Sequence, residues 1–106
     1  MGVYVVWETW LKPGRASEGY DITRAIWQDM REFKGYIGHF LLRDQDDPGH
    51  LLLISHWESR QDADESKRQY ASSQKVVELQ PHLSRERGRT VYDLKEANNF
   101  TVRASV

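Results

Sequence analysis

The sequence predicts an α+β domain with the ferredoxin-like order β-α-β-β-α-β, in which two helices cover one face of an antiparallel sheet. Three observations lead to this prediction. Segments rich in β-branched and aromatic residues alternate with segments whose apolar residues recur at helical spacing. Turn-forming Gly, Pro and Asp residues separate these segments. The chain has 106 residues, the size of one domain, which we expect over 1–106 with a core at 3–95 and a tail at 96–106.

Four segments are expected to form strands, namely 3–11, 36–44, 51–58 and 88–95. A hairpin loop is expected at 45–50, which holds Asp, Pro and Gly. The first and third strands have large apolar side chains at both alternating sets of positions, a pattern typical of strands covered on both faces. The helices can cover only one face of the sheet. We therefore predict that the other face packs on the same face of a second copy, in a two-fold homodimer.

A long helix is expected over 15–34, because apolar side chains recur there at helical intervals (Ile22, Ile26, Met30 and Phe33). Gly35 is placed as the helix stop. A second helix is expected over 60–70, after a Ser59–Asp62 pair that resembles an N-cap. A further helical segment follows it and is limited by Pro81. The residues from 98 to 106 are expected to form a short extra strand or a loose end.

The charge balance argues against nucleic acid or an anionic membrane surface as a general partner. Lys and Arg number 15 and Asp and Glu number 16, so the net charge is −1. The absence of cysteine excludes disulfides, thiolate metal sites and a cysteine nucleophile. Apolar runs are far shorter than the roughly 20 residues that cross a bilayer, and the N-terminus lacks a signal-peptide pattern. We therefore expect a soluble, cytoplasmic protein with no membrane partner.

Four separated strings resemble those of the antibiotic biosynthesis monooxygenase (ABM) domain family: Leu-Lys-Pro-Gly at 11–14, the segment 34–39, the segment 41–48, and Ile-Ser-His-Trp-Glu-Ser at 54–59. The resemblance covers roughly residues 3–95. It implies a dimeric α+β barrel with a pocket between the helices and the sheet of each subunit. It also implies a cofactor-free oxygenase that uses O₂ on a small anthrone- or quinol-like aromatic, with neither a cofactor nor a metal.

Other members of this family degrade heme, and the resemblance assigns that branch an Asn on the first strand, a Trp in the second helix and a His after it. In this sequence the three positions fall on Trp7, near Ser66 and near Val76, so none of the three residue types is kept. His82 is a few residues away from the position of the iron ligand. Heme binding is therefore a third hypothesis, less favoured than oxygenation without a cofactor.

Oxygenation without a cofactor requires a base, an apolar pocket and hydrogen bonds to an anion. His39 and His56 are the candidate catalytic bases, because an imidazole titrates near working pH. The candidate substrate-binding side chains are Trp7, Trp27, Met30, Trp57, Tyr70 and His82. Each has an alternative role as a core residue or as a hydrogen-bonded structural residue. The sequence leaves open which face of the sheet each histidine occupies.

A rival hypothesis is a non-catalytic dimer that binds a small molecule in the same pocket, because fold alone does not fix function. A closed aromatic cavity with an inward-facing histidine favours the oxygenase. A shallow cavity with both histidines bonded elsewhere favours the binding protein.

Overall fold

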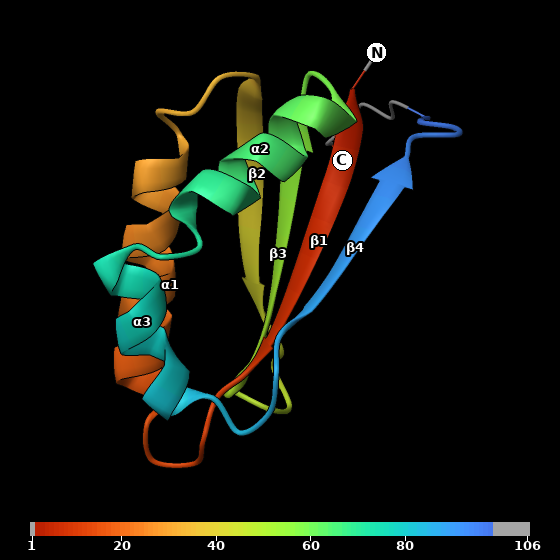
Figure 1. The fold of residues 1–106 in the computed structure, drawn as a ribbon. Helices are drawn as coiled ribbons and strands as arrows, with labels where there is room; N and C mark the ends of the chain where they lie inside the picture. Colours follow the sequence, from red (N-terminus) through yellow and green to blue (C-terminus); the bar gives the residue numbers. More distant parts are fainter. Residues whose placement is uncertain (1, 99–106) are drawn as a thin grey trace.

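The computed structural model describes residues 2–98, which form a four-stranded antiparallel sheet with helices on one face (Figure 1). The strands are β1 (Val3–Trp10), β2 (Tyr36–Arg43), β3 (His50–Trp57) and β4 (Gly88–Asp93), in the order β2-β3-β1-β4. The helices are α1 (Ala16–Met30), α2 (Arg60–Tyr70) and α3 (Gln74–Leu79), and a 3-10 turn, η1 (Gln80–His82), follows α3. The ferredoxin-like α+β fold predicted from the sequence is confirmed.

The first helix is shorter than predicted. It ends at Met30, because the next backbone N–H groups, those of Glu32 and Phe33, donate to carbonyls only three residues back, at 3.0 and 3.2 Å. The predicted stop, Gly35, lies beyond this tight turn and has a φ of +85°. A side chain at Gly35 would collide with the Asp62 carboxylate, so glycine also permits a close approach to α2.

The second helix has the predicted bounds. The Ser59 side chain accepts a hydrogen bond from the Asp62 backbone N–H at 3.0 Å, which confirms the predicted N-cap. The further helical segment is α3, capped in the same way by Ser73, and Pro81 lies in the 3-10 turn that ends it. The third strand begins at His50, one residue earlier than predicted, so His50 belongs to the strand and not to the predicted hairpin loop.

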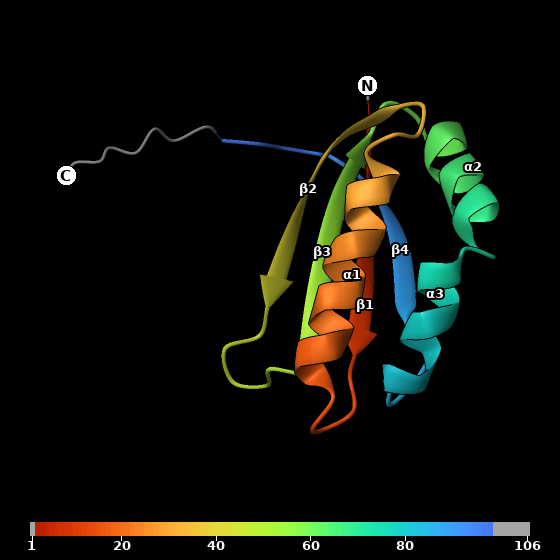
Figure 2. The same cartoon turned by 90° about the vertical axis from the view of Figure 1, so that its left-hand side faces the viewer.

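The register of β1 with its two neighbours sorts the side chains onto two faces of the sheet. Val5 pairs with Ser55, and Trp7 pairs with both Leu53 and Arg89, so these side chains share one face. The helices cover this face, which we call the helix face (Figure 2). No helix of the described chain covers the opposite face, which we call the open face.

The core lies on the helix face. Its largest fully buried side chain is Trp57, whose indole Nε1 donates to the Ser55 hydroxyl at 3.0 Å. The Ser55 hydroxyl in turn donates to the Val5 carbonyl of the neighbouring strand, at 3.1 Å. This chain of hydrogen bonds satisfies the polar atoms that burial would otherwise leave unpaired, and it fixes the orientation of the indole.

None of the helices within residues 2–98 has the length and apolar character needed to cross a bilayer. The expectation for the tail falls mostly on residues 99–106, which lie outside the described residues.

Candidate functional site

A cavity of about 190 Å³ lies between the sheet and the helices. β1 and β3 contribute Val5, Trp7 and Trp57, which form its floor. The last two turns of α1 contribute one wall, composed of Ile26, Trp27 and Met30. The opposite wall comes from α2 and its C-terminal end, through Ala63, Ser66, Lys67, Tyr70 and Ala71. Val76 of α3 and two arginines, Arg87 and Arg89, complete the lining.

The aromatic lining is held in place by packing. Trp27 and Met30 are each 5% exposed, so α1 presents them rigidly to the cavity. Tyr36 packs edge-on against Trp57, with ring centroids 5.7 Å apart. A cavity walled by three indoles offers flat surfaces against which an aromatic ligand can stack.

Tyr70 presents its ring to the cavity, while its hydroxyl is bonded elsewhere. The hydroxyl donates to Asp29 Oδ2 at 2.6 Å, and the ring packs edge-on against Phe33. Burial and the Asp29 carboxylate raise the pKa of the Tyr70 hydroxyl to about 12. This hydroxyl is therefore fully protonated at neutral pH, and its hydrogen is already committed to Asp29.

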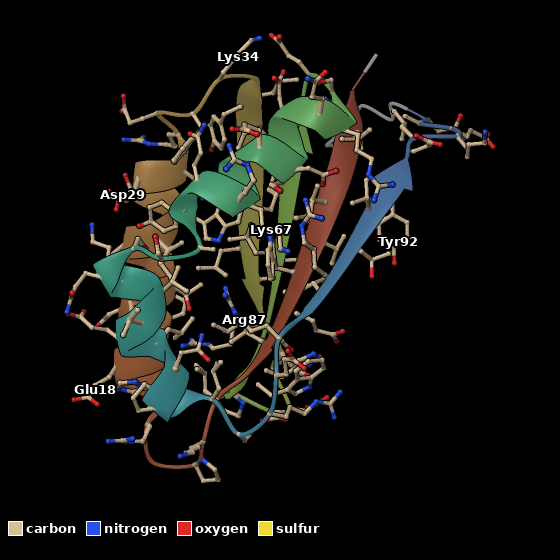
Figure 3. All side chains as sticks on the ribbon, viewed as in Figure 1. Glu18, Asp29, Lys34, Lys67, Arg87 and Tyr92 are labelled. Carbon is tan, nitrogen blue, oxygen red and sulfur yellow. The ribbon has the colours of Figure 1, made fainter. Side chains whose placement is uncertain are left out.

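Three cationic side chains meet at the other end of the cavity, and Figure 3 shows Lys67 and Arg87 between the helices and strands β1 and β4. The guanidinium of Arg87 lies over the Trp7 ring, 4.6 Å from its centroid, and that of Arg89 lies 5.8 Å away. Burial lowers the pKa of the Arg87 guanidinium. Arg89 donates to Asp64 at 2.9 Å, but its Nε is buried without a hydrogen-bond partner in residues 2–98.

An outer hollow of about 440 Å³ adjoins the cavity. The two share the side chains of Trp7, Lys67, Arg87 and Arg89, so the cations lie at the boundary between them. The hollow is also lined by the carboxylate of Glu86. We call this boundary, defined by Lys67, Arg87 and Arg89, the cationic mouth.

The two candidate bases lie on opposite faces of the sheet. His39 pairs with Ser55 and lies on the helix face, where its ring packs against Trp27 at a centroid distance of 5.6 Å. Its Nδ1 is 2.5 Å from the Tyr36 hydroxyl. Burial, and then the nearby charge of Arg31, lower the pKa of His39. Trp27 lines the cavity, but His39 does not.

His56 and His82 both lie away from the cavity. His56 is on the open face, where it stacks on Tyr4 with ring centroids 4.2 Å apart. His82, in η1, is 3.1 Å from Glu18 through Nε2 and 3.1 Å from the Glu78 carbonyl through Nδ1. The structure thus brings together around one cavity Trp7, Trp27, Met30, Trp57 and Tyr70, but none of the three predicted histidines. The functional roles of all eight residues remain predictions.

Comparison with known proteins identifies the family. A family model described as antibiotic biosynthesis monooxygenase matches residues 2–78. The chain belongs to this family. The match includes β1, α1, β2, β3 and α2, so it covers most of the cavity lining, while Arg87 and Arg89 lie beyond it. No curated protein matches the sequence.

Solved structures share the ABM fold at low sequence identity. The cofactor-independent oxygenase SnoaB from Streptomyces nogalater has a TM-score of 0.80 at 14% identity, over 91% of this chain and 95% of that one. Rv0793 from Mycobacterium tuberculosis has a TM-score of 0.77 at 23% identity, over 92% of this chain and 100% of that one. A conserved protein from Methanosarcina mazei Go1 has a TM-score of 0.78 at 18% identity, over 90% and 94%.

The residues of this ABM chain do not fit the heme-degrading pattern. The three positions that the sequence resemblance assigned to that pattern fall on Trp7, near Ser66 and near Val76, and these three residues line the cavity. The valine has no atom that can ligate iron, and the described residues contain no cluster of three or more His, Cys, Asp or Glu side chains suited to a metal ion.

The sequence analysis missed the cationic mouth of this ABM domain. Arg89 falls within the predicted strand 88–95 and Arg87 just before it, and neither was named as a candidate site residue. Within β4, Arg89 has the same parity as Val91, which pairs with Val5 on the helix face, and Arg87 lies just before the strand. That parity was a usable signal for Arg89, because a strand position that packs on a core seldom holds an arginine.

Proposed function

We propose that this protein is a cofactor-independent monooxygenase that oxidises a small anthrone- or quinol-like aromatic with O₂. The observation that carries the proposal is the cavity walled by Trp7, Trp27 and Trp57 in a chain of the ABM family. SnoaB, which shares the fold, is described as a cofactor-independent oxygenase. The indoles would hold a planar substrate by stacking and exclude water from its reacting carbon.

The reaction balances without any further redox partner. An anthrone-like substrate loses a proton from its ring CH₂ group, and the resulting anion passes one electron to O₂. The two radicals combine into a peroxide, which loses water and leaves a ring carbonyl. One oxygen atom enters the product, and the other leaves as water with the two hydrogens of the CH₂ group. The protein must therefore accept a proton and stabilise an oxyanion.

We assign the stabilisation of the oxyanion to Arg89 and the acceptance of the substrate's proton to His39. The buried Nε–H of Arg89, which has no hydrogen-bond partner in residues 2–98, is a charged donor of the kind that stabilises developing negative charge strongly. The lowered pKa of His39 keeps the imidazole neutral, which a base requires. For this role Nδ1 must carry a proton and donate it to the Tyr36 oxygen, which leaves Nε2 free to accept. One bridging water would connect Nε2 to the substrate past Trp27.

The test is oxygen uptake by metal-free protein with a panel of anthrones and hydroquinones. We expect uptake above the autoxidation rate, its loss in His39→Ala and its retention in His56→Ala, since His56 lies on the open face. Trp27→Ala, which removes a wall of the cavity, should raise KM. Oxygen uptake that never exceeds the autoxidation rate, or that is unchanged in His39→Ala, contradicts the proposal.

One observation favours a second candidate function, a binding protein without catalysis. No His, Asp or Glu side chain lines the cavity within the described residues, so a base reaches it only indirectly. A non-catalytic protein would bind the same aromatics without consuming O₂. Calorimetric binding in the absence of uptake identifies this second function.

We further propose that the protein is a homodimer formed through the open face. That face exposes Phe40 by 68% and also exposes Leu42 and Tyr92. A row of exposed apolar side chains on an otherwise polar domain is typical of an interface. A second copy would cover it sheet on sheet.

A further inference from the structure

The cationic mouth carries more positive charge than the described chain neutralises. Arg89 is the only one of its three cations with an ion-pair partner in residues 2–98, because Asp64 accepts from it at 2.9 Å. Asp64 is shared, since it also pairs with Arg60 at 3.3 Å. Neither Lys67 nor Arg87 has a carboxylate oxygen within the 4.0 Å ion-pair limit in this part of the chain. Glu86 lines only the outer hollow.

Keeping an unpaired guanidinium partly out of water is costly. The Arg87 guanidinium is desolvated enough for burial to lower its pKa. Its position over Trp7, 4.6 Å from the ring centroid, offsets part of this cost through a cation–π interaction. Trp7 itself lines the cavity, so this stacking also keeps the Arg87 guanidinium at the cavity. An anion bound at this place would supply the missing partner.

The proposed oxidation uses one cation at most, because a single oxyanion develops and Arg89 is assigned to it. The proposed oxidation gives Lys67 and Arg87 no role. Both line the cavity and the outer hollow, so a group held between them would lie at the end of a ligand rather than at its centre. The rest of the ligand would occupy the apolar, indole-walled part of the cavity.

We propose that the ligand of this cavity is an aromatic carboxylate, whose permanent negative charge is bound by Lys67 and Arg87 at the cationic mouth. This inference rests on the site of the proposed function and narrows its substrate class. A guanidinium can bind either a carboxylate or a phosphate through two parallel hydrogen bonds, so the carboxylate is favoured on size, as the smaller of the two groups. The cavity of about 190 Å³ is small for a ligand site, which suits one or two fused rings with a single small charged group.

The test compares three probes of one shape by isothermal titration calorimetry: 2-naphthoate, the neutral 2-naphthamide and 2-naphthyl phosphate. We expect 2-naphthoate to bind about tenfold more tightly than the amide, the ratio that one modest ion pair supplies. Arg87→Gln and Lys67→Gln should each remove most of this preference, so that the acid and the amide bind with similar affinities in each variant. Arg68→Gln is the matched control, since Arg68 lies on α2, pairs with Glu65 and does not line the cavity.

Several outcomes overturn the inference. These are equal affinities for acid and amide, no binding of either at roughly millimolar concentration, tighter binding of the phosphate, or a preference that survives both substitutions. Circular dichroism and thermal melting confirm that each variant is folded.

The calorimetric measurement of binding does not depend on O₂, so it tests this inference separately from the proposed oxidation. Uptake with neutral anthrones but no carboxylate preference overturns this inference and leaves the oxygenase standing. A carboxylate preference without uptake supports this inference and contradicts the oxygenase.

Discussion

The Tyr70 hydroxyl donates a hydrogen bond to Asp29, and the same carboxylate oxygen accepts one from Lys75, both at 2.6 Å. These contacts join the end of α1, the last residue of α2 and the first turn of α3. They close the helical layer beside the cavity that the Tyr70 ring lines. Figure 3 shows Asp29 at the outer edge of this layer.

Tyr70→Phe should therefore lower the melting temperature while it keeps the aromatic wall of the cavity. Loss of one partly exposed hydrogen bond, about 1 kcal/mol, predicts a decrease of roughly 4–8 °C at neutral pH. The raised pKa of Tyr70, about 12, makes this contribution complete below pH 10, the ordinary pKa of tyrosine, and lost as pH rises toward 12. Tyr92→Phe, an exposed position on the open face, is the control and should melt like the wild type. Equal melting of both variants would mean that the Tyr70 hydroxyl does not stabilise the fold.

The acid limb of the oxidation rate should lie below pH 6.5. Burial and Arg31 lower the pKa of His39 from that value, so the imidazole stays neutral and able to accept a proton until the pH is distinctly acidic. Tyr36→Phe should slow the reaction, because it removes the partner that orients the ring and fixes its tautomer. The measurement is kcat/KM for oxygen uptake from pH 5 to 8. An acid limb unchanged in His39→Gln excludes His39 as the base.

His50 should give the opposite pH dependence, in stability rather than in rate. Its imidazole lies between Asp44 and Glu8, at 3.0 and 2.7 Å, and both carboxylates raise its pKa, Asp44 more strongly. Trp10 stacks on the ring, and Arg85 lies on Trp10. A raised pKa in the folded state means that the stabilisation is complete below pH 6.5 and is lost as pH rises through the folded-state pKa.

The measurement for His50 is the difference in melting temperature between the wild type and His50→Gln from pH 5.5 to 9. We expect this difference to shrink as pH rises. The pKa of Asp44 is lowered, chiefly by His50 and then by the Asp46 backbone N–H, so its contribution is present above pH 3.8 and is lost in acid. A difference that stays constant across the range would show that His50 carries no proton-linked stability. The His56→Gln variant is the control, since His56 lies on the same face without an acidic partner in the described chain.

The fold was predictable from the sequence because its signals are local. Ser59 caps α2 through contacts within three residues, and the helical spacing of Ile26 and Met30 predicts the buried side of α1. The end of α1 was not predictable in the same way. Phe33 continues the apolar stripe, yet it lies in the tight turn that brings Gly35 against Asp62, and that contact depends on tertiary structure.

The aromatic residues of the candidate site could be predicted from the sequence, whereas the position of its charged residues could not. Large apolar residues on β1 and α1 indicate a core, and in this fold the core surrounds the cavity. The side of the sheet that His39 occupies depends on the irregular register between Tyr36 and Gly38, which one sequence does not show. The parity of Arg89 indicates the helix face, but its pairing with Trp7 joins strands that are about 80 residues apart in the chain, so the three-dimensional register is needed to place the cationic mouth beside the indoles.

Phe40→Glu should shift the protein from dimer to monomer. Phe40 is 68% exposed on the open face, and a charge there could not be buried against a second sheet without a partner. Sedimentation velocity at micromolar concentration measures the outcome. Val77→Glu is the matched control, because Val77 is an exposed apolar residue on α3, away from the open face. A wild-type monomer, or a dimer that tolerates Phe40→Glu, contradicts the proposed interface.

Arg87→Met should stabilise the ligand-free protein while it abolishes carboxylate binding. The guanidinium is partly desolvated over Trp7 and has no ion-pair partner in the described chain, so a flexible apolar side chain of similar length removes a cost and keeps the packing on the indole. We expect unfolding to become less favourable by about 0.5–1 kcal/mol, within the range for relieving an unfavourable functional residue. Arg68→Met, which breaks a surface pair with Glu65, should change stability by less than about 0.5 kcal/mol. Chemical denaturation of the two variants measures both values. If Arg87→Met is destabilising, the contact with Trp7 outweighs the desolvation of the charge, and Arg87 is then explained by the fold without any anionic ligand.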